Sequence, residues 1–101
     1  KRLAPITVAV SPLLKNKTEL TEKAKEIDLM LRKFFAVQYD ESGTIGKRYR
    51  RQDEVGTPYC VTIDFETLTD KAVTLRDRAT MSQERVAIAD LVSFITKKLE
   101  Q

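Results

Sequence analysis

The residues best suited to chemistry form a cationic run at positions 47–51. Lys47, Arg48, Arg50 and Arg51 surround one aromatic residue, Tyr49. Clusters of Lys and Arg bind polyanions, because each cation displaces a counterion from a phosphate. A charge run is also typical of a solvated helix face, so the spacing alone leaves both interpretations open.

A second group of polar and aromatic residues follows two expected strands. Phe65 and Glu66 come after the first of them, and Arg76, Asp77 and Arg78 end the second. Single-stranded RNA is bound by stacking its bases on aromatic rings or guanidinium planes and by hydrogen bonds to the base edges. A carboxylate beside an arginine matches the N4 donor of cytosine and its N3 and O2 acceptors. The group therefore indicates RNA binding, and the alternative for Phe65 is a place in the core.

Catalysis has little support in the composition. The 101 residues contain no histidine, and their net charge is only +3. Histidine is the commonest general base and metal ligand, so we expect no catalytic residue and no metal site here. Cys60 is the single cysteine and stands in a β-branched run, which favours a small core residue over a nucleophile. No Gly-rich phosphate loop follows a strand.

These groups need a scaffold, and the apolar pattern predicts one α/β domain. A chain of 101 residues is long enough for a single core. Runs rich in β-branched residues predict strands at 6–10, 36–40, 59–64 and 72–76. A helix beginning near Thr18 carries an apolar stripe at spacings of three and four, made of Leu20, Ala24, Ile27, Leu31 and Phe34. Strand, helix and strand in this order predict a parallel pair.

The cationic run falls within a second expected helix, Ile45–Val55, which Gly56 ends. A short connection joins the strands at 59–64 and 72–76, which predicts that they pair antiparallel. Residues 82–86 fit either a charged edge strand or the start of the last helix. That helix has its own apolar stripe, made of Ile88, Leu91, Val92, Ile95 and Leu99.

Three blocks of this sequence resemble a known family. They are residues 39–58 (YDESGTIGKRYRRQDEVGTP), 60–68 (CVTIDFETL) and 73–81 (VTLRDRATM). Together they resemble the C-terminal anticodon-binding domain of dimeric class II glycyl-tRNA synthetases. Part of the first block is shared with the prolyl-, threonyl- and histidyl-tRNA enzymes, whereas the other two blocks point to the glycyl branch. The resemblance covers essentially the whole chain.

The resemblance implies a three-layer α/β/α fold. Its five-stranded mixed sheet has one antiparallel strand, the fourth, and helices cover both faces. This favours a strand at 82–86 and a last helix that begins near Ile88.

The resemblance also implies a function in translation. Residues 1–101 would be a single anticodon-binding domain of a longer synthetase, with the catalytic domain upstream and absent from this chain. The domain would bind the anticodon of glycine tRNA and position that tRNA for ATP-dependent aminoacylation, with no aminoacylation by the fragment alone. ATP and Mg would belong to the parent enzyme, with no cofactor in this domain. The parent would be a cytoplasmic homodimer without a membrane segment. The alternative is a protein-interaction module of the same fold, as in the accessory subunit of a mitochondrial DNA polymerase.

By matching positions, the resemblance assigns RNA contacts at three places that would face the anticodon together. Lys47, Phe65 and Arg78 are the expected base contacts, and Arg48, Glu66 and Arg76 are expected at bases or phosphates. Position 47 is more often arginine in the family, so Lys47 departs from a planar, bidentate contact. Ala79 replaces a residue that is more often acidic. Four further residues are expected to be scaffold, namely Tyr49, Asp53, Gly56 and Pro58.

Overall fold

The computed structural model describes residues 6–100 of the chain. Its elements follow one another in the order β1 (Val8–Pro12), α1 (Thr18–Arg32), β2 (Val37–Tyr39), α2 (Ile45–Val55), β3 (Tyr59–Ile63), α3 (Phe65–Asp70), β4 (Ala72–Asp77), β5 (Ser82–Ala87), the 3-10 turn η1 (Ile88–Asp90) and α4 (Leu91–Leu99).

The strands form one mixed sheet in the order β2-β1-β3-β4-β5. β1 pairs parallel with both β2 and β3, whereas β4 runs antiparallel to β3 and β5. The predicted parallel pair and the antiparallel fourth strand are both confirmed. Residues 82–87 form β5, so the strand alternative for this segment is correct and the last helix follows from Ile88.

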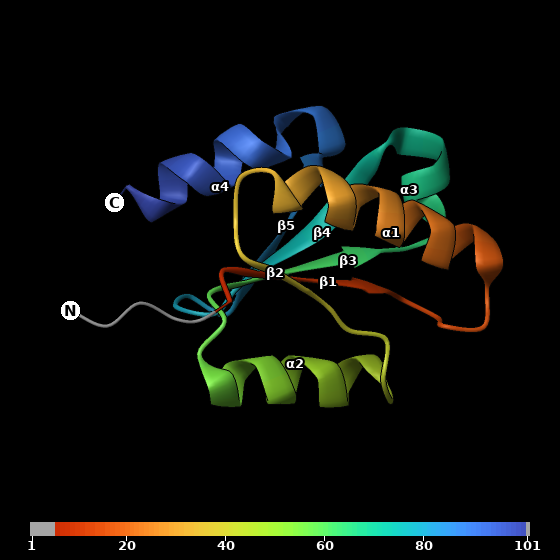
Figure 1. The fold of residues 1–101 in the computed structure, drawn as a ribbon, viewed down its shortest axis with the longest axis horizontal. Coiled ribbons are helices and arrows are strands. Elements are labelled where there is room, and N and C mark those ends of the chain that lie inside the picture. Colours follow the sequence, from red (N-terminus) through yellow and green to blue (C-terminus); the bar gives the residue numbers. More distant parts are fainter. Residues whose placement is uncertain (1–5, 101) are drawn as a thin grey trace.

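Helices cover the sheet on two sides (Figure 1). α1, α3 and α4 lie on one side and α2 on the other, which confirms the three-layer arrangement. The first side holds the apolar core, because alternate strand residues such as Val8, Val10, Val61 and Ile63 are fully buried there. They pack with the stripes of the two long helices on that side, which consist of Leu20, Ala24, Ile27 and Leu31 on α1 and Leu91 and Ile95 on α4.

The α2 layer is held by polar contacts. The buried residues of α2 are Arg48 and Gln52. Gln52 donates to Asp40, which follows β2, and accepts from the hydroxyl of Thr57. The helix ends as predicted at Gly56, whose φ of 83° lies in the left-handed region that glycine adopts without strain.

Three details of the fold differ from expectation. β1 continues through Pro12, because the amide of Leu13 still bonds to the carbonyl of Ile63. Phe34 is 59% exposed and does not extend the apolar stripe, since α1 ends at Arg32, and Leu99, expected in the stripe of the last helix, is likewise exposed. The connection between β3 and β4 contains the short helix α3, where only a connecting segment was expected.

Candidate nucleic-acid interface

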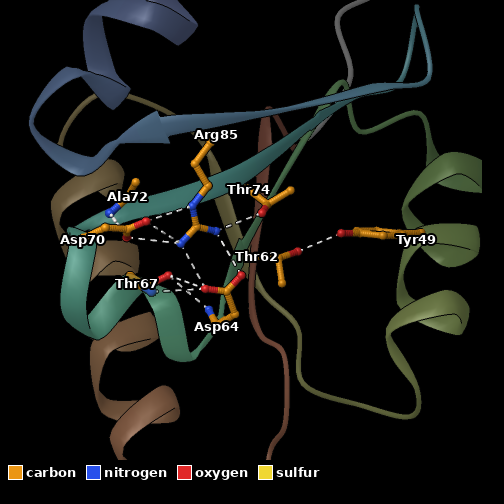
Figure 2. A network of polar contacts seen from close by, with 8 residues as sticks. All are labelled: Tyr49, Thr62, Asp64, Thr67, Asp70, Ala72, Thr74 and Arg85. Carbon is orange, nitrogen blue, oxygen red and sulfur yellow. Dashed lines mark hydrogen bonds and ion pairs between the residues drawn. The ribbon is translucent and has the colours of Figure 1, made fainter.

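On the α2 side, half of the sheet face is left open. The strand register aligns Thr62 of β3, Thr74 of β4 and Arg85 of β5 on this side. Thr62 is buried beside α2, with its hydroxyl 2.9 Å from that of Tyr49, whereas Thr74 is half-buried and Arg85 is exposed. Figure 2 shows this row running from α2 to β5. We call the α2-side surface of β4 and β5 the open half-face; it is formed by Thr74, Arg76, Gln83 and Arg85.

A charged network crosses the open half-face. The guanidinium of Arg85 forms a fork with Asp64, at 2.9 and 3.1 Å, and also donates to Asp70 and to the hydroxyl of Thr74. Hydrogen bonds from Arg85 hold the pKa of Asp70 below its ordinary value. Burial alone would raise the pKa of Asp64, but the hydrogen bonds from Arg85 and Thr67 outweigh it and lower that pKa. Both carboxylates are therefore ionised at neutral pH.

Phe65 lies at one end of this surface, where β3 passes into α3. Asp64 caps the helix: its carboxylate accepts from the amide of Thr67, whose hydroxyl accepts from the amide of Asp64. Such a reciprocal cap fixes the first turn of a helix. Phe65, the first helical residue, is 44% exposed and, with Glu66, Thr69 and Asp70, lines a hollow of about 330 Å³. The prediction of an accessible aromatic beside a carboxylate fits this corner, and the core alternative for Phe65 does not.

Arg76 and Arg78 lie at the other end, beside the last turn of α2. Arg76 is only 8% exposed; it forms a fork with Asp53 at 2.8 and 3.1 Å and stacks over the ring of Tyr49 at 4.8 Å. The hydrogen bond from Arg76 lowers the pKa of Asp53. Arg78 is exposed, and its Nε donates to the backbone carbonyl of Asp53 at 3.2 Å. Arg78 therefore keeps most of its guanidinium accessible, whereas Arg76 is an internal group.

Two residues of the cationic run lie away from the open half-face. Arg48 is 3% exposed and donates to the backbone carbonyls of Pro12 and Gly43, so it ties α2 to the end of β1. Lys47 is exposed on the flank of α2 that also carries Arg51 one turn later. Arg51 pairs with Asp40 after β2, at the sheet edge opposite β5.

The structure thus does not bring the predicted contacts into one cluster. Phe65 and Glu66 follow the carboxyl end of β3, while the amide of Arg78 bonds to Pro58, just before β3 begins. The five residues of β3 separate these ends by roughly 16 Å at ~3.3 Å per residue. Phe65 and Arg78 lie at opposite ends of the open half-face. Lys47 lies on the flank of α2 that faces away from this surface. The resemblance implied that these residues face the anticodon together, but the order of residues along the chain does not show at which end of the sheet each one lies.

Comparison with known proteins gives a family for this architecture. Residues 7–98 match the protein family described as "Anticodon binding domain". The chain belongs to this family. The resemblance that the sequence motifs indicated is therefore confirmed.

Named relatives of this anticodon binding domain are glycine–tRNA ligases. The protein of that name from Clostridium tetani is 55% identical over 98 residues, and the one from Nocardia farcinica is 50% identical over 99 residues. The matches cover 97% and 98% of this chain but 20% and 21% of those proteins. The chain therefore spans about a fifth of the length of the curated relatives it matches.

Solved structures agree on the fold of the anticodon binding domain. The RNA binding domain of threonyl-tRNA synthetase from Cryptosporidium parvum superposes with a TM-score of 0.80 at 29% identity, covering 92% of this chain and 23% of that one. Prolyl-tRNA synthetase from the same organism gives a TM-score of 0.87 at 23% identity, with 96% and 21% coverage. At the lower identity the likeness concerns the fold alone.

One functional candidate in this anticodon binding domain escaped the sequence reasoning. Arg85 was interpreted only as a charged edge residue, yet it joins Asp64, Asp70 and Thr74, which are far from it in sequence. The alternation of β5 could have placed it on the same side as Thr74, but its partners follow from the tertiary fold. Within residues 6–100, no cluster of potential ligands suits a metal ion, and no helix has the length and apolar character to cross a bilayer.

Proposed function

We propose that the open half-face binds the single-stranded anticodon loop of a glycine tRNA, and that the chain acts as the anticodon-binding part of a glycine–tRNA ligase. The proposal combines the family of the chain, the names of its relatives and the geometry of this surface.

The observation that carries the proposal is a polar sheet surface with an exposed aromatic corner at one end and an exposed arginine at the other. Phe65 offers a ring on which a splayed base stacks. Glu66, beside the same hollow, accepts from the exocyclic amino group of a cytosine. Arg78 supplies donors at the far end. An RNA loop lying along the half-face would contact both ends.

Three residues with predicted RNA contacts are not among the contacts proposed here. The guanidinium groups of Arg48 and Arg76 have internal partners, and withdrawing that of Arg48 would leave the buried carbonyl of Pro12 unpaired. Lys47 lies on the other flank of α2. The proposed contacts are therefore Phe65, Glu66 and Arg78.

Aminoacylation belongs, in this proposal, to the remaining part of such a ligase, together with its ATP and Mg. Dimer formation and a cytoplasmic location stay predictions. The named relatives favour this function over the protein-interaction module, the alternative that the fold alone left open.

The test is binding of the chain to an anticodon stem-loop of glycine tRNA and to stem-loops in which the anticodon cytosines are replaced. We expect the cytosine loop to bind about tenfold more tightly, since one mismatched base contact costs ~1–3 kcal/mol. Phe65→Ala should weaken binding to every loop about tenfold, because it removes the ring on which a base stacks. Arg78→Ala should weaken the cytosine loop more than the replaced loops if Arg78 contacts a base.

Phe34→Ala is the matched control for Phe65→Ala. Phe34 is also an exposed phenylalanine, but it follows α1 and lies away from the open half-face, so its removal should leave the affinity for the loops intact. Equal affinity of the wild-type chain for every loop would refute base recognition. Equal losses from both phenylalanine variants would refute the assignment of the binding surface.

A further inference from the structure

Arg85 is the residue of the open half-face whose contacts need an explanation beyond RNA binding. Its side chain starts from the edge strand β5, passes over Thr74 of β4 and ends between Asp64 and Asp70 (Figure 2). These two carboxylates lie at the two ends of α3: Asp64 is its N-cap and Asp70 its last residue. One guanidinium thus holds both ends of a helix.

α3 depends on such support because it has only six residues. Isolated helices of this length are not stable, since the cost of the first turn is not recovered by later hydrogen bonds. Its C-cap, Lys71, has a positive φ of 55°, which is uncommon for a residue other than glycine. Asp70 also accepts from the amide of Ala72, which ties the end of α3 to β4.

The hydrogen bonds of Arg85 leave its guanidinium no free donor. A guanidinium has five N–H groups. Nε donates to Asp70, Nη1 to Asp64 and Thr74, and Nη2 to Asp64 and Asp70, with every distance between 2.9 and 3.4 Å. An arginine that bound a phosphate or a base edge would have to give up some of these bonds.

We propose that Arg85 is a positioning residue: it clamps α3 at both ends and thereby holds Phe65 at the edge of the open half-face, without contacting RNA itself. The proposal rests on the proposed function for its RNA consequence. The clamp itself is a property of the folded chain and is tested separately.

The first measurement is amide hydrogen exchange in the chain without RNA. Arg85→Lys keeps the positive charge but cannot form the two-sided fork, because an ammonium is a point donor on a flexible stem. We expect the amides of Thr67 and Lys71, which are bonded within α3, to exchange about tenfold faster in this variant. Arg32→Lys is the matched control, because Arg32 pairs with Asp28 on α1, away from α3.

The second measurement is a double-mutant cycle on the affinity for the cytosine stem-loop. Arg85→Lys should reduce that affinity about as much as Phe65→Ala, by about tenfold, since both remove the fixed stacking ring. In the Phe65→Ala background, Arg85→Lys should cause no further loss. The dependence of affinity on salt should be unchanged, because no phosphate contact is removed.

Each contrary result overturns a defined part of the inference. Unchanged exchange in α3 shows that Arg85 does not clamp the helix. Additive losses in the double variant show that Arg85 acts independently of Phe65, which overturns the positioning role. If the wild-type chain does not distinguish the loops, the proposed function fails and the RNA role of Arg85 fails with it, while the exchange data still decide the clamp.

Discussion

The two halves of one sheet face use the same residue types in opposite ways. Under α2, Arg48, Asp40 and Gln52 are buried: Gln52 donates to Asp40, and Arg48 donates to the carbonyls of Pro12 and Gly43. Across β4 and β5, Arg85 and Asp64 form a similar polar network, but their side chains stay 31% and 21% exposed. The polar groups of the covered half fasten a helix, while those of the open half border a surface that a ligand can reach.

This difference shows why charge density along the chain is a poor guide to the binding site. The densest cationic run lies in α2, and one of its arginines, Arg48, donates to backbone carbonyls within the fold. The open half-face has fewer cations, yet its exposed ring and exposed Arg78 are accessible together. The position of α2 over the sheet, more than the number of cations, decides which of them are available to RNA.

The largest expected effect is a loss of stability when a buried polar residue under α2 is replaced. Arg48→Met keeps much of the side-chain volume but removes the donors to Pro12 and Gly43, which leaves the buried carbonyl of Pro12 without a partner. We expect a loss of about 3 kcal/mol in the free energy of unfolding, measured by urea denaturation. Arg50→Met, an exposed neighbour in the same helix, is the control and should change stability by less than ~0.5 kcal/mol. Equal small effects from both variants would show that Arg48 is not structural.

Local sequence signals were sufficient for most of the fold. The predicted bounds of α2, Ile45–Val55, agree with the structure, in which Thr44 caps the start by accepting from the amide of Lys47 and Gly56 ends the helix as predicted. The antiparallel pairing of β3 and β4 follows from the short connection between them. Such features depend on a few neighbouring residues, so the sequence alone predicted them.

The site was less predictable, because it depends on which face of a helix and which end of the sheet each residue occupies. Lys47 and Arg48 are adjacent in sequence, but a helix turns by about 100° per residue, so one faces solvent and the other the sheet. Phe65 and Arg78 were expected to lie together, yet the direction of β3 and β4 sends them to opposite ends. The clamp by Arg85 joins residues up to 21 positions apart and has no local signature.

A smaller loss of stability is expected at the border between the two halves, where Arg76 of β4 pairs with Asp53 of α2. Asp53, whose pKa is lowered by the hydrogen bond from Arg76, stabilises the fold fully above its ordinary pKa of 3.8 and loses this contribution as the pH falls below that value. Asp53→Asn should lower the free energy of unfolding by about 1 kcal/mol at pH 7. The loss is modest because the Arg76–Asp53 ion pair is partly exposed. Urea denaturation between pH 7 and 3 should show a smaller loss of stability on acidification in this variant than in the wild type. Parallel pH curves would contradict the role of the Arg76–Asp53 pair.

The smallest expected effect compares two exposed cations, one on each side of α2. Arg78→Ala should lower the slope of log affinity against log salt by about one if Arg78 contacts a phosphate, and Lys47→Ala should leave that slope unchanged and the affinity within about twofold. Neither should change stability by more than ~0.5 kcal/mol, because both side chains are exposed. The measurement is stem-loop binding over a range of salt concentrations. A larger loss from Lys47→Ala than from Arg78→Ala would place the RNA on the flank of α2 nearest β2, where Lys47 lies, and away from the open half-face.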